Sequence, residues 1–112
     1  MKIINDFDKF VEGAVLRGKA ISTGDYKTAN KLSKKLHDFY IRIKDTDGLN
    51  KLAAFLNHEN ENVRYYAAIY YLKYDEEVAL TVLEELTKLP TIISTSAKMT
   101  LEAWRKGLLD AL

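Results

Sequence analysis

Apolar residues recur every three or four positions along most of the chain, and this spacing places them on one face of an α-helix. No stretch alternates apolar and polar residues as a half-buried strand does. The connections between the apolar segments are short and polar. The pattern therefore predicts an all-α fold of about six helices in antiparallel pairs. The expected helices span residues 6–21, 25–44, 47–56, 60–73, 75–88 and 92–106.

The fourth of these segments has almost no purely polar face. Val63, Ala67 and Leu72 follow helical spacing, and tyrosines fill most of the positions between them. The run YYAAIYY also suits a strand, but Asn60 is placed to cap a helix just before it. We therefore interpret the segment as a central helix that other helices cover on more than one side. Its tyrosines, together with one just beyond it, are Tyr65, Tyr66, Tyr70, Tyr71 and Tyr74.

The other segments carry narrower apolar stripes, which we expect to face the core. Asp25 and Asp75 are placed to cap the second and fifth helices, and Gly107 to end the last one. Gly18 on the first stripe predicts that the second helix packs closely against it. The stripes are Phe7, Phe10, Val11, Ala14 and Ile21; Ala29, Leu32, Leu36, Tyr40 and Ile43; Leu49, Leu52, Ala53 and Leu56; Ala79, Val82, Leu83 and Leu86; and Ile93, Ala97, Leu101 and Trp104.

The length and composition favour one globular domain over residues 1–112. Hydrophobic residues make up 47% of the chain and charged residues 29%, which is not the composition of a disordered segment. The sequence contains no cysteine, no signal peptide and no apolar run of the roughly 20 residues that span a membrane. We therefore expect a soluble cytoplasmic protein without a membrane partner.

Residues 49–88 resemble a HEAT-type repeat. The segment LNKLAAFL corresponds to a second helix, NENVRYYAAIYYL to the next first helix, and DEEVALTVLEEL to the helix after it. The series from Val63 to Leu72 is the most specific part, whereas Glu61 stands where the repeat often has proline. The segment AISTGDYKTANKL is similar to the turn of a tetratricopeptide (TPR) helix pair. The resemblance implies a HEAT- or TPR-like right-handed stack of helix pairs.

Over nearly the whole chain, the segments GDYKTANK, VRYYAA and SAKMTLEAWRKG together resemble a small bacterial family of unknown function with HEAT-like helical repeats. Some members of such families are encoded beside polymorphic or contact-dependent toxin genes. The resemblance therefore implies an immunity protein that binds and neutralises a toxin.

No motif in the sequence predicts catalysis, a cofactor or a metal site. His58 and Glu59 resemble the start of a HExxH zinc motif, but Asn62 stands where the second histidine would be. The turn at residues 45–48 lacks the ligand series of a calcium loop, and His37 lies on another element. The paired carboxylates lie at helix starts or on polar faces, where we expect solvated side chains and not the buried or paired carboxylate that catalysis would require. We therefore expect a protein that is not an enzyme and requires neither metal nor cofactor.

Five residues are candidates for contact with a partner, and they are Arg64, Tyr65, Tyr71, Lys98 and Arg105. The arginine at the position of Arg64 in HEAT-type repeats usually has a structural role, in which it bonds an acidic partner or backbone carbonyls at the turn of an adjacent repeat. Most of the tyrosines should pack between helices, with one or two facing a partner. Trp104 beside Arg105 has the composition of a binding hot spot, but it shares the apolar stripe of its helix, so we interpret it as core.

A basic patch is expected on the outer side of the second helix. Because the net charge of the chain is only +1, a polyanion could be bound only through such a local patch. A solvated helix face explains the same pattern. The first functional hypothesis is a non-catalytic helical-repeat module that binds another protein, and the alternative is a nucleic-acid-binding domain that uses the patch. The patch consists of Lys27, Lys31, Lys34, Lys35 and Arg42.

Overall fold

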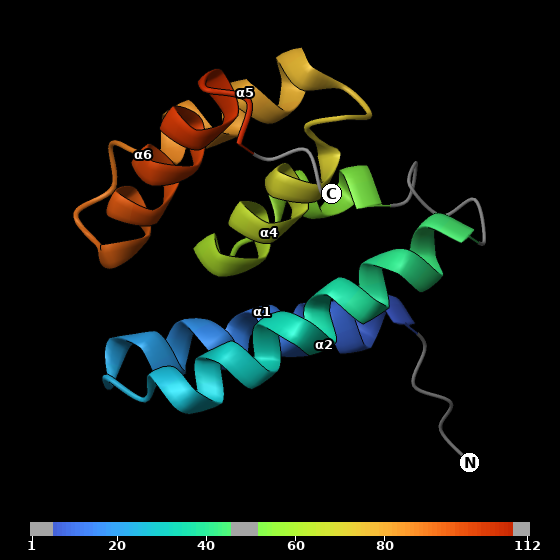
Figure 1. The fold of residues 1–112 in the computed structure, drawn as a ribbon, viewed down its shortest axis with the longest axis vertical. Coiled ribbons are helices and arrows are strands. Elements are labelled where there is room, and N and C mark those ends of the chain that lie inside the picture. Colours follow the sequence, from blue (N-terminus) through green and yellow to red (C-terminus); the bar gives the residue numbers. More distant parts are fainter. Residues whose placement is uncertain (1–5, 46–51, 109–112) are drawn as a thin grey trace. The chain divides into compact units, whose positions relative to one another are not determined.

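The computed structural model describes residues 6–45 and 52–108, and every regular element in these ranges is a helix (Figure 1). The all-α prediction is confirmed, because the described residues contain no strand. The chain divides into two compact units, Met1–Leu52 and Ala53–Leu112. The expectation of a single domain over residues 1–112 stays a prediction. None of the described helices combines the length and the apolar character needed to cross a bilayer.

The first unit contains α1 (Asp6–Ser22) and α2 (Tyr26–Asp45), which pack as an antiparallel hairpin (Figure 1). Gly24 has a φ of +78°, in the left-handed region that favours glycine, and the Asp25 N–H donates to the Ala20 carbonyl at 2.8 Å. The Asp25 side chain accepts a hydrogen bond from the backbone N–H of Thr28 at 3.2 Å. Asp25 therefore caps α2 as predicted, directly after the turn that ends α1.

The two helices of this hairpin approach each other closely at Gly13. A Cβ atom on Gly13 would lie 3.2 Å from Cδ2 of Leu36, so a larger residue there would push that side chain aside. Gly18, where the sequence predicts close packing, is half-buried. The Arg17 Nε donates to the Ser33 Oγ at 2.6 Å and joins the same two helices. The predicted stripes of α1 and α2 are buried at Phe10, Ala14, Ala29, Leu36, Tyr40 and Ile43.

The second unit contains the short 3₁₀ helix η1 (Ala53–Asn57) and the helices α4 (Glu61–Tyr71), α5 (Glu76–Leu86) and α6 (Ile92–Arg105). Helix α4 contacts η1, α5 and α6, and α5 also contacts α6. The third predicted helix is only partly described: Ala53–Asn57 is 3₁₀ helix, and residues 47–51, with Leu49, lie outside the described residues.

Helix α4 has almost no polar face, as predicted, because seven of its eleven residues are buried. Ala67 and Ala68 expose no surface at all. The hydroxyl oxygens of Tyr65 and Thr100 lie 2.7 Å apart and connect α4 to α6 through a buried hydrogen bond. The buried residues of α4 are Val63, Tyr65, Tyr66, Ala67, Ala68, Tyr70 and Tyr71.

Three predicted helix ends in the second unit are confirmed, the starts of α4 and α5 and the end of α6, whereas α4 and α5 end at Tyr71 and Leu86, two residues earlier than predicted. The Asn60 side chain accepts a hydrogen bond from the Asn62 N–H at 2.9 Å and caps α4. Asp75 caps α5 by accepting one from the Val78 N–H at 3.3 Å. Gly107 has a φ of +73° just after α6, where it ends the helix. These local bonds determine where α4, α5 and α6 begin or end.

Candidate functional site

The predicted contact residues lie on α4, on the outer face of α2 and in two grooves of the second unit. Within residues 6–45 and 52–108, no group of three or more His, Cys, Asp or Glu side chains could hold a metal ion. The His58 Nδ1 accepts a hydrogen bond from the Asn60 N–H at 3.0 Å, so this histidine supports the turn before α4. Every buried side-chain nitrogen and oxygen of the described residues has a hydrogen-bond partner.

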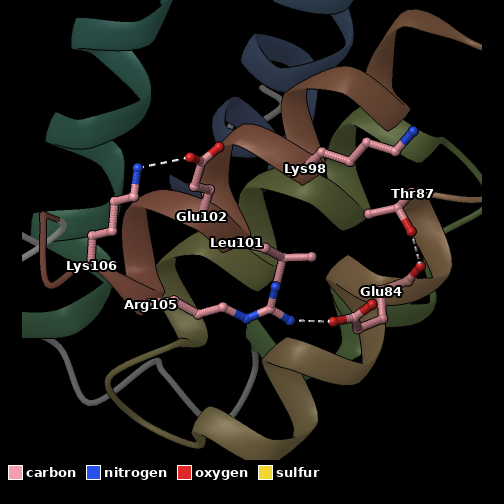
Figure 2. A pocket seen from close by; sticks show the side chains of 7 residues that line it. All are labelled: Glu84, Thr87, Lys98, Leu101, Glu102, Arg105 and Lys106. Atoms are coloured by element: carbon pink, nitrogen blue, oxygen red, sulfur yellow. Dashed lines mark hydrogen bonds and ion pairs between the residues drawn. The ribbon is translucent and has the colours of Figure 1, made fainter.

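The first groove lies between α5 and α6 and brings together two predicted contact residues, Lys98 and Arg105 (Figure 2). We call it the α5–α6 groove, and its volume is about 540 Å³. Leu101, a predicted core residue, is buried and also lines this groove. The lining residues are Glu84, Thr87, Lys98, Leu101, Glu102, Arg105 and Lys106.

Ion pairs engage most of the charges in the α5–α6 groove (Figure 2). Arg105 extends from α6 to Glu84 on α5, with 2.7 Å between Nη2 and Oε1. Lys106 pairs with Glu102 one helical turn away at 2.8 Å. Because both pairs are exposed, each stabilises the fold by roughly 0–1 kcal/mol. A partner that binds Arg105 must therefore compete with Glu84.

The second groove lies between η1, the end of α4 and α5, and it contains the predicted contact residue Tyr71. Its volume is about 540 Å³, which is within the range of ligand sites. Val78 is 42% exposed, so the groove presents an apolar side chain to solvent. We call it the acidic groove, and it is lined by Ala53, Leu56, Asn57, Tyr71, Asp75, Glu77, Val78, Thr81, Val82 and Glu85.

Negative charge surrounds the apolar surface of the acidic groove. Asp75, Glu77 and Glu85 line it, and none of its described lining residues is Lys or Arg. Desolvation raises the pKa of Tyr71, and the neighbouring Tyr74 and the Asp75 carboxylate raise that pKa further. Tyr74 is 49% exposed, and its ring meets that of Tyr71 edge-on with centroids 5.0 Å apart. Aromatic, apolar and anionic surfaces therefore adjoin at this end of α5.

Trp104 is half-buried, so its interpretation as core holds for only part of its surface. The earlier positions of its stripe, Ile93, Ala97 and Leu101, are buried as predicted. The indole Nε1 donates to the Glu76 Oε1 at 2.9 Å and joins the end of α6 to the start of α5. Trp104 therefore combines partial packing with an exposed hydrogen bond between two helices.

Arg64 and Tyr65 lie on α4 and do not line either groove. The Arg64 Nη1 donates to the carbonyl oxygens of His58 at 2.7 Å and Glu59 at 3.2 Å. Its guanidinium thus holds the turn before its own helix, and not the turn of an adjacent repeat that the resemblance implies. The Tyr65 hydroxyl bonds to Thr100 inside the unit. Contact of these two residues with a partner stays a prediction.

The five residues of the basic patch are all exposed. They lie on the side of α2 opposite the buried Ala29 and Leu36, and the helix rises about 22 Å from residue 27 to residue 42. Helix α2 carries six Lys or Arg side chains and two Asp side chains. One of the acids, Asp38, lies within the basic face and lowers its positive potential.

Sequence reasoning did not identify the acidic groove. It treats acids such as Glu77 and Glu85 as solvated side chains and places Val82 on the inner stripe of the fifth helix. Val78 is the available signal, because it is an apolar residue outside that stripe but beside Val82 on the helix surface. Asn57 and Tyr71 come from other elements, so the groove arises only when these elements pack together.

Comparison with family models, with curated proteins and with solved structures finds no match for the chain.

Proposed function

We propose that this chain is a non-catalytic helical module that binds another protein. The observation that carries the proposal is the acidic groove, in which exposed apolar surface is bordered by charged side chains. Protein interfaces typically combine an apolar, often aromatic, centre with a polar rim. Val78 supplies the exposed apolar side chain, the largely buried Val82 lines the groove one turn away, and Tyr74 lies near the groove as an exposed aromatic side chain.

The first partner class to test is a toxin that the module neutralises, because of the family resemblance of the segments GDYKTANK, VRYYAA and SAKMTLEAWRKG. A HEAT-like arrangement is part of the proposal. Its support is that α4 contacts α5 and α5 contacts α6, as successive helices do in a repeat stack. Such a module binds through side chains that several helices present together, and the acidic groove draws on η1, α4 and α5.

A photo-crosslinking amino acid at Thr81 tests the proposal in the native host. Thr81 lines the acidic groove, whereas Thr95 is also an exposed threonine, lies on α6 outside the groove and provides the control position. We expect one protein to crosslink from position 81 and not from position 95. The crosslinked protein is then purified, and its affinity for the uncrosslinked wild-type chain is measured by calorimetry.

Val78→Asp should weaken this affinity at least about tenfold, which corresponds to roughly 1.4 kcal/mol, with little change in melting temperature because Val78 is exposed. Met99→Asp is the matched control, since Met99 is an exposed apolar residue of α6 that lies outside the groove. Equal affinities of the wild-type and Val78→Asp proteins would contradict binding through the acidic groove.

A second candidate function is nucleic-acid binding through α2, favoured by the exposure of all five basic residues on one helix face. If four or five of them contact phosphates, log affinity for duplex DNA should fall against log salt with a slope near about −4. Lys31→Gln with Lys34→Gln should make this slope shallower by about 2. Lys88→Gln with Lys98→Gln removes the same charge outside α2 and should leave the slope unchanged. Absence of binding to both duplex DNA and RNA at low salt would rule out this function.

A further inference from the structure

Helix α5, which forms one side of the acidic groove, carries only negatively charged side chains among its ionisable residues. This helix contains four glutamates and no Lys or Arg, and its N-cap Asp75 adds a fifth carboxylate. Three of these five carboxylates line the groove. In the described lining no basic side chain neutralises them, in contrast to the α5–α6 groove, where Arg105 pairs with Glu84. A ligand in the acidic groove therefore meets negative charge beside apolar surface, and of the three carboxylates Asp75 is also engaged as the cap of α5.

The spacing along α5 defines what fits this surface. Glu77 and Glu85 are eight residues apart, which corresponds to about 12 Å along the helix. Val78 and Val82 lie one turn apart between them. A complementary segment therefore places an apolar side chain on the exposed Val78, one turn from the largely buried Val82, and a cationic side chain near each glutamate. Tyr74, exposed at the start of this surface, offers an aromatic face to a further cation.

We infer that the acidic groove takes a cationic segment of the partner protein, with Lys or Arg on either side of an apolar residue. The inference rests on the proposed function and adds the chemistry of the partner to it. Charge complementarity selects this occupant, because an acidic segment would be repelled by all three lining carboxylates. An uncharged apolar segment would leave those carboxylates partly desolvated without a counter-charge.

Selection from a displayed library of short random peptides tests the inference on the full-length chain. Peptides are selected on the wild-type protein after depletion on the neutral variant Val78→Asn, which removes the apolar contact without adding charge, so that the retained peptides depend on Val78 in the acidic groove. We expect these peptides to be enriched in Lys and Arg beside an apolar residue and depleted of Asp and Glu. If the retained peptides are acidic or show no charge preference, the inference is wrong, whereas peptide binding by the groove is upheld.

If no peptide binds in a Val78-dependent manner and Thr81 crosslinks no protein, the proposed function fails and the inference fails with it. The two failures are therefore distinguishable. If Thr81 does crosslink a partner, the crosslinked segment of that partner replaces the peptide as the probe, and its Lys and Arg content decides the inference directly.

Neutral isosteres then measure the contribution of charge. Glu77→Gln with Glu85→Gln should weaken a selected peptide about five- to tenfold at about 50 mM salt, with a smaller effect at about 200 mM, because exposed pairs are weak and screened. Glu12→Gln with Glu59→Gln changes the net charge equally at exposed sites outside the groove and should have little effect. Equal effects of the two double variants would overturn the inference.

The basic face of α2 in a second copy of this chain is the competing occupant. Sedimentation of the wild-type protein at low salt distinguishes it, and we expect a monomer. Salt-sensitive self-association that Glu77→Gln with Glu85→Gln abolishes would show that the groove takes another copy of the chain, which would overturn the assignment to a separate partner.

Discussion

Trp104 illustrates how one side chain can stabilise the fold and still face solvent. Its ring continues the stripe of Ile93, Ala97 and Leu101, and its N–H reaches Glu76 on the neighbouring helix. Truncation of a fully buried Trp costs about 3–5 kcal/mol, and a half-buried ring forfeits only part of that amount. Truncation of Trp104 should therefore lower the free energy of unfolding by less than truncation of a fully buried Trp, but by more than truncation of an exposed interface residue.

Trp104→Ala should lower the free energy of unfolding by about 2–3 kcal/mol in urea denaturation. Trp104→Phe keeps most of the apolar contact but loses the indole donor, so it should cost only about 0.5–1 kcal/mol. Glu76→Ala should have a similar small effect, and combining it with Trp104→Phe should add little, because both changes remove the same bond. A Trp104→Ala protein with the wild-type denaturation midpoint would show that the ring contributes no packing.

Tyr65→Phe should destabilise the protein by about 1–2 kcal/mol, because it removes the hydrogen bond to the buried Thr100 hydroxyl without changing the shape of the core. Adding Thr100→Val should recover part of the loss, since no hydroxyl is then left unpaired. Thermal or urea denaturation of the two single variants and the double variant measures the coupling. Additive losses in the double variant would mean that the two hydroxyls do not stabilise each other.

At the scale of elements, the turn between α1 and α2 concentrates two functions in consecutive residues. Gly24 ends α1 in a left-handed conformation, and Asp25 both closes that end through its N–H and caps α2 through its side chain. Hydrogen bonds from the Thr28 side chain and backbone hold the pKa of Asp25 below its ordinary value of 3.8, assisted by Lys31. The hairpin should therefore be sensitive to acid at this turn.

Asp25→Ala should lower the melting temperature at neutral pH. The difference in melting temperature between this variant and the wild type should become smaller in acid. The ionised Asp25 stabilises the fold fully at a pH above its ordinary pKa of 3.8. This stabilisation is lost as the pH falls through the lowered pKa of Asp25 in the folded state. Asp25→Asn retains a side-chain acceptor, so its melting temperature at neutral pH should fall less than that of Asp25→Ala. Because the Asn side chain does not ionise, it should contribute no pH dependence of its own. A difference between Asp25→Ala and wild type that stays constant from neutral to acidic pH would contradict this role.

At the scale of the whole molecule, the chain separates charge although its net charge is only +1. Residues 1–56 contain eleven basic and seven acidic side chains, and residues 57–112 contain six and nine. In the structure this asymmetry is concentrated on two helices, the basic α2 and the acidic α5. The basic α2 favours anionic ligands and the acidic α5 favours cationic ligands. Salt screens both attractions, so it should weaken the binding of either ligand.

Ala67→Arg tests the central position of α4 in the second unit. Ala67 has no exposed surface, so an arginine there would overpack the helix contacts and bury an unpaired charge, at a cost on the order of several kcal/mol. We expect loss of cooperative unfolding, measured by circular dichroism. Ala54→Arg is the matched control, because Ala54 is exposed on η1 and should tolerate the same change. An Ala67→Arg protein that melts like wild type would contradict a buried α4.

The elements of the fold could be predicted from the sequence because their causes are local. Asn60 and Asp75 bond backbone groups two or three residues away, and Gly24 and Gly107 each permit the positive φ of a helix end. The apolar stripes likewise depend on spacing within one helix, which is why the inner residues of α5 are buried as expected. The sequence by itself therefore determined the helices and most of their buried faces.

The surfaces were decided only by the tertiary structure, because each joins residues far apart in the chain. Arg105 and Glu84 pair across 21 positions, and Tyr65 and Thr100 across 35. The acidic groove exists because Asn57, Tyr71 and Glu85 come from three elements that pack together, and no periodicity within one helix encodes that arrangement. Local spacing says which side of a helix is buried, whereas packing between helices decides which exposed side chains become neighbours.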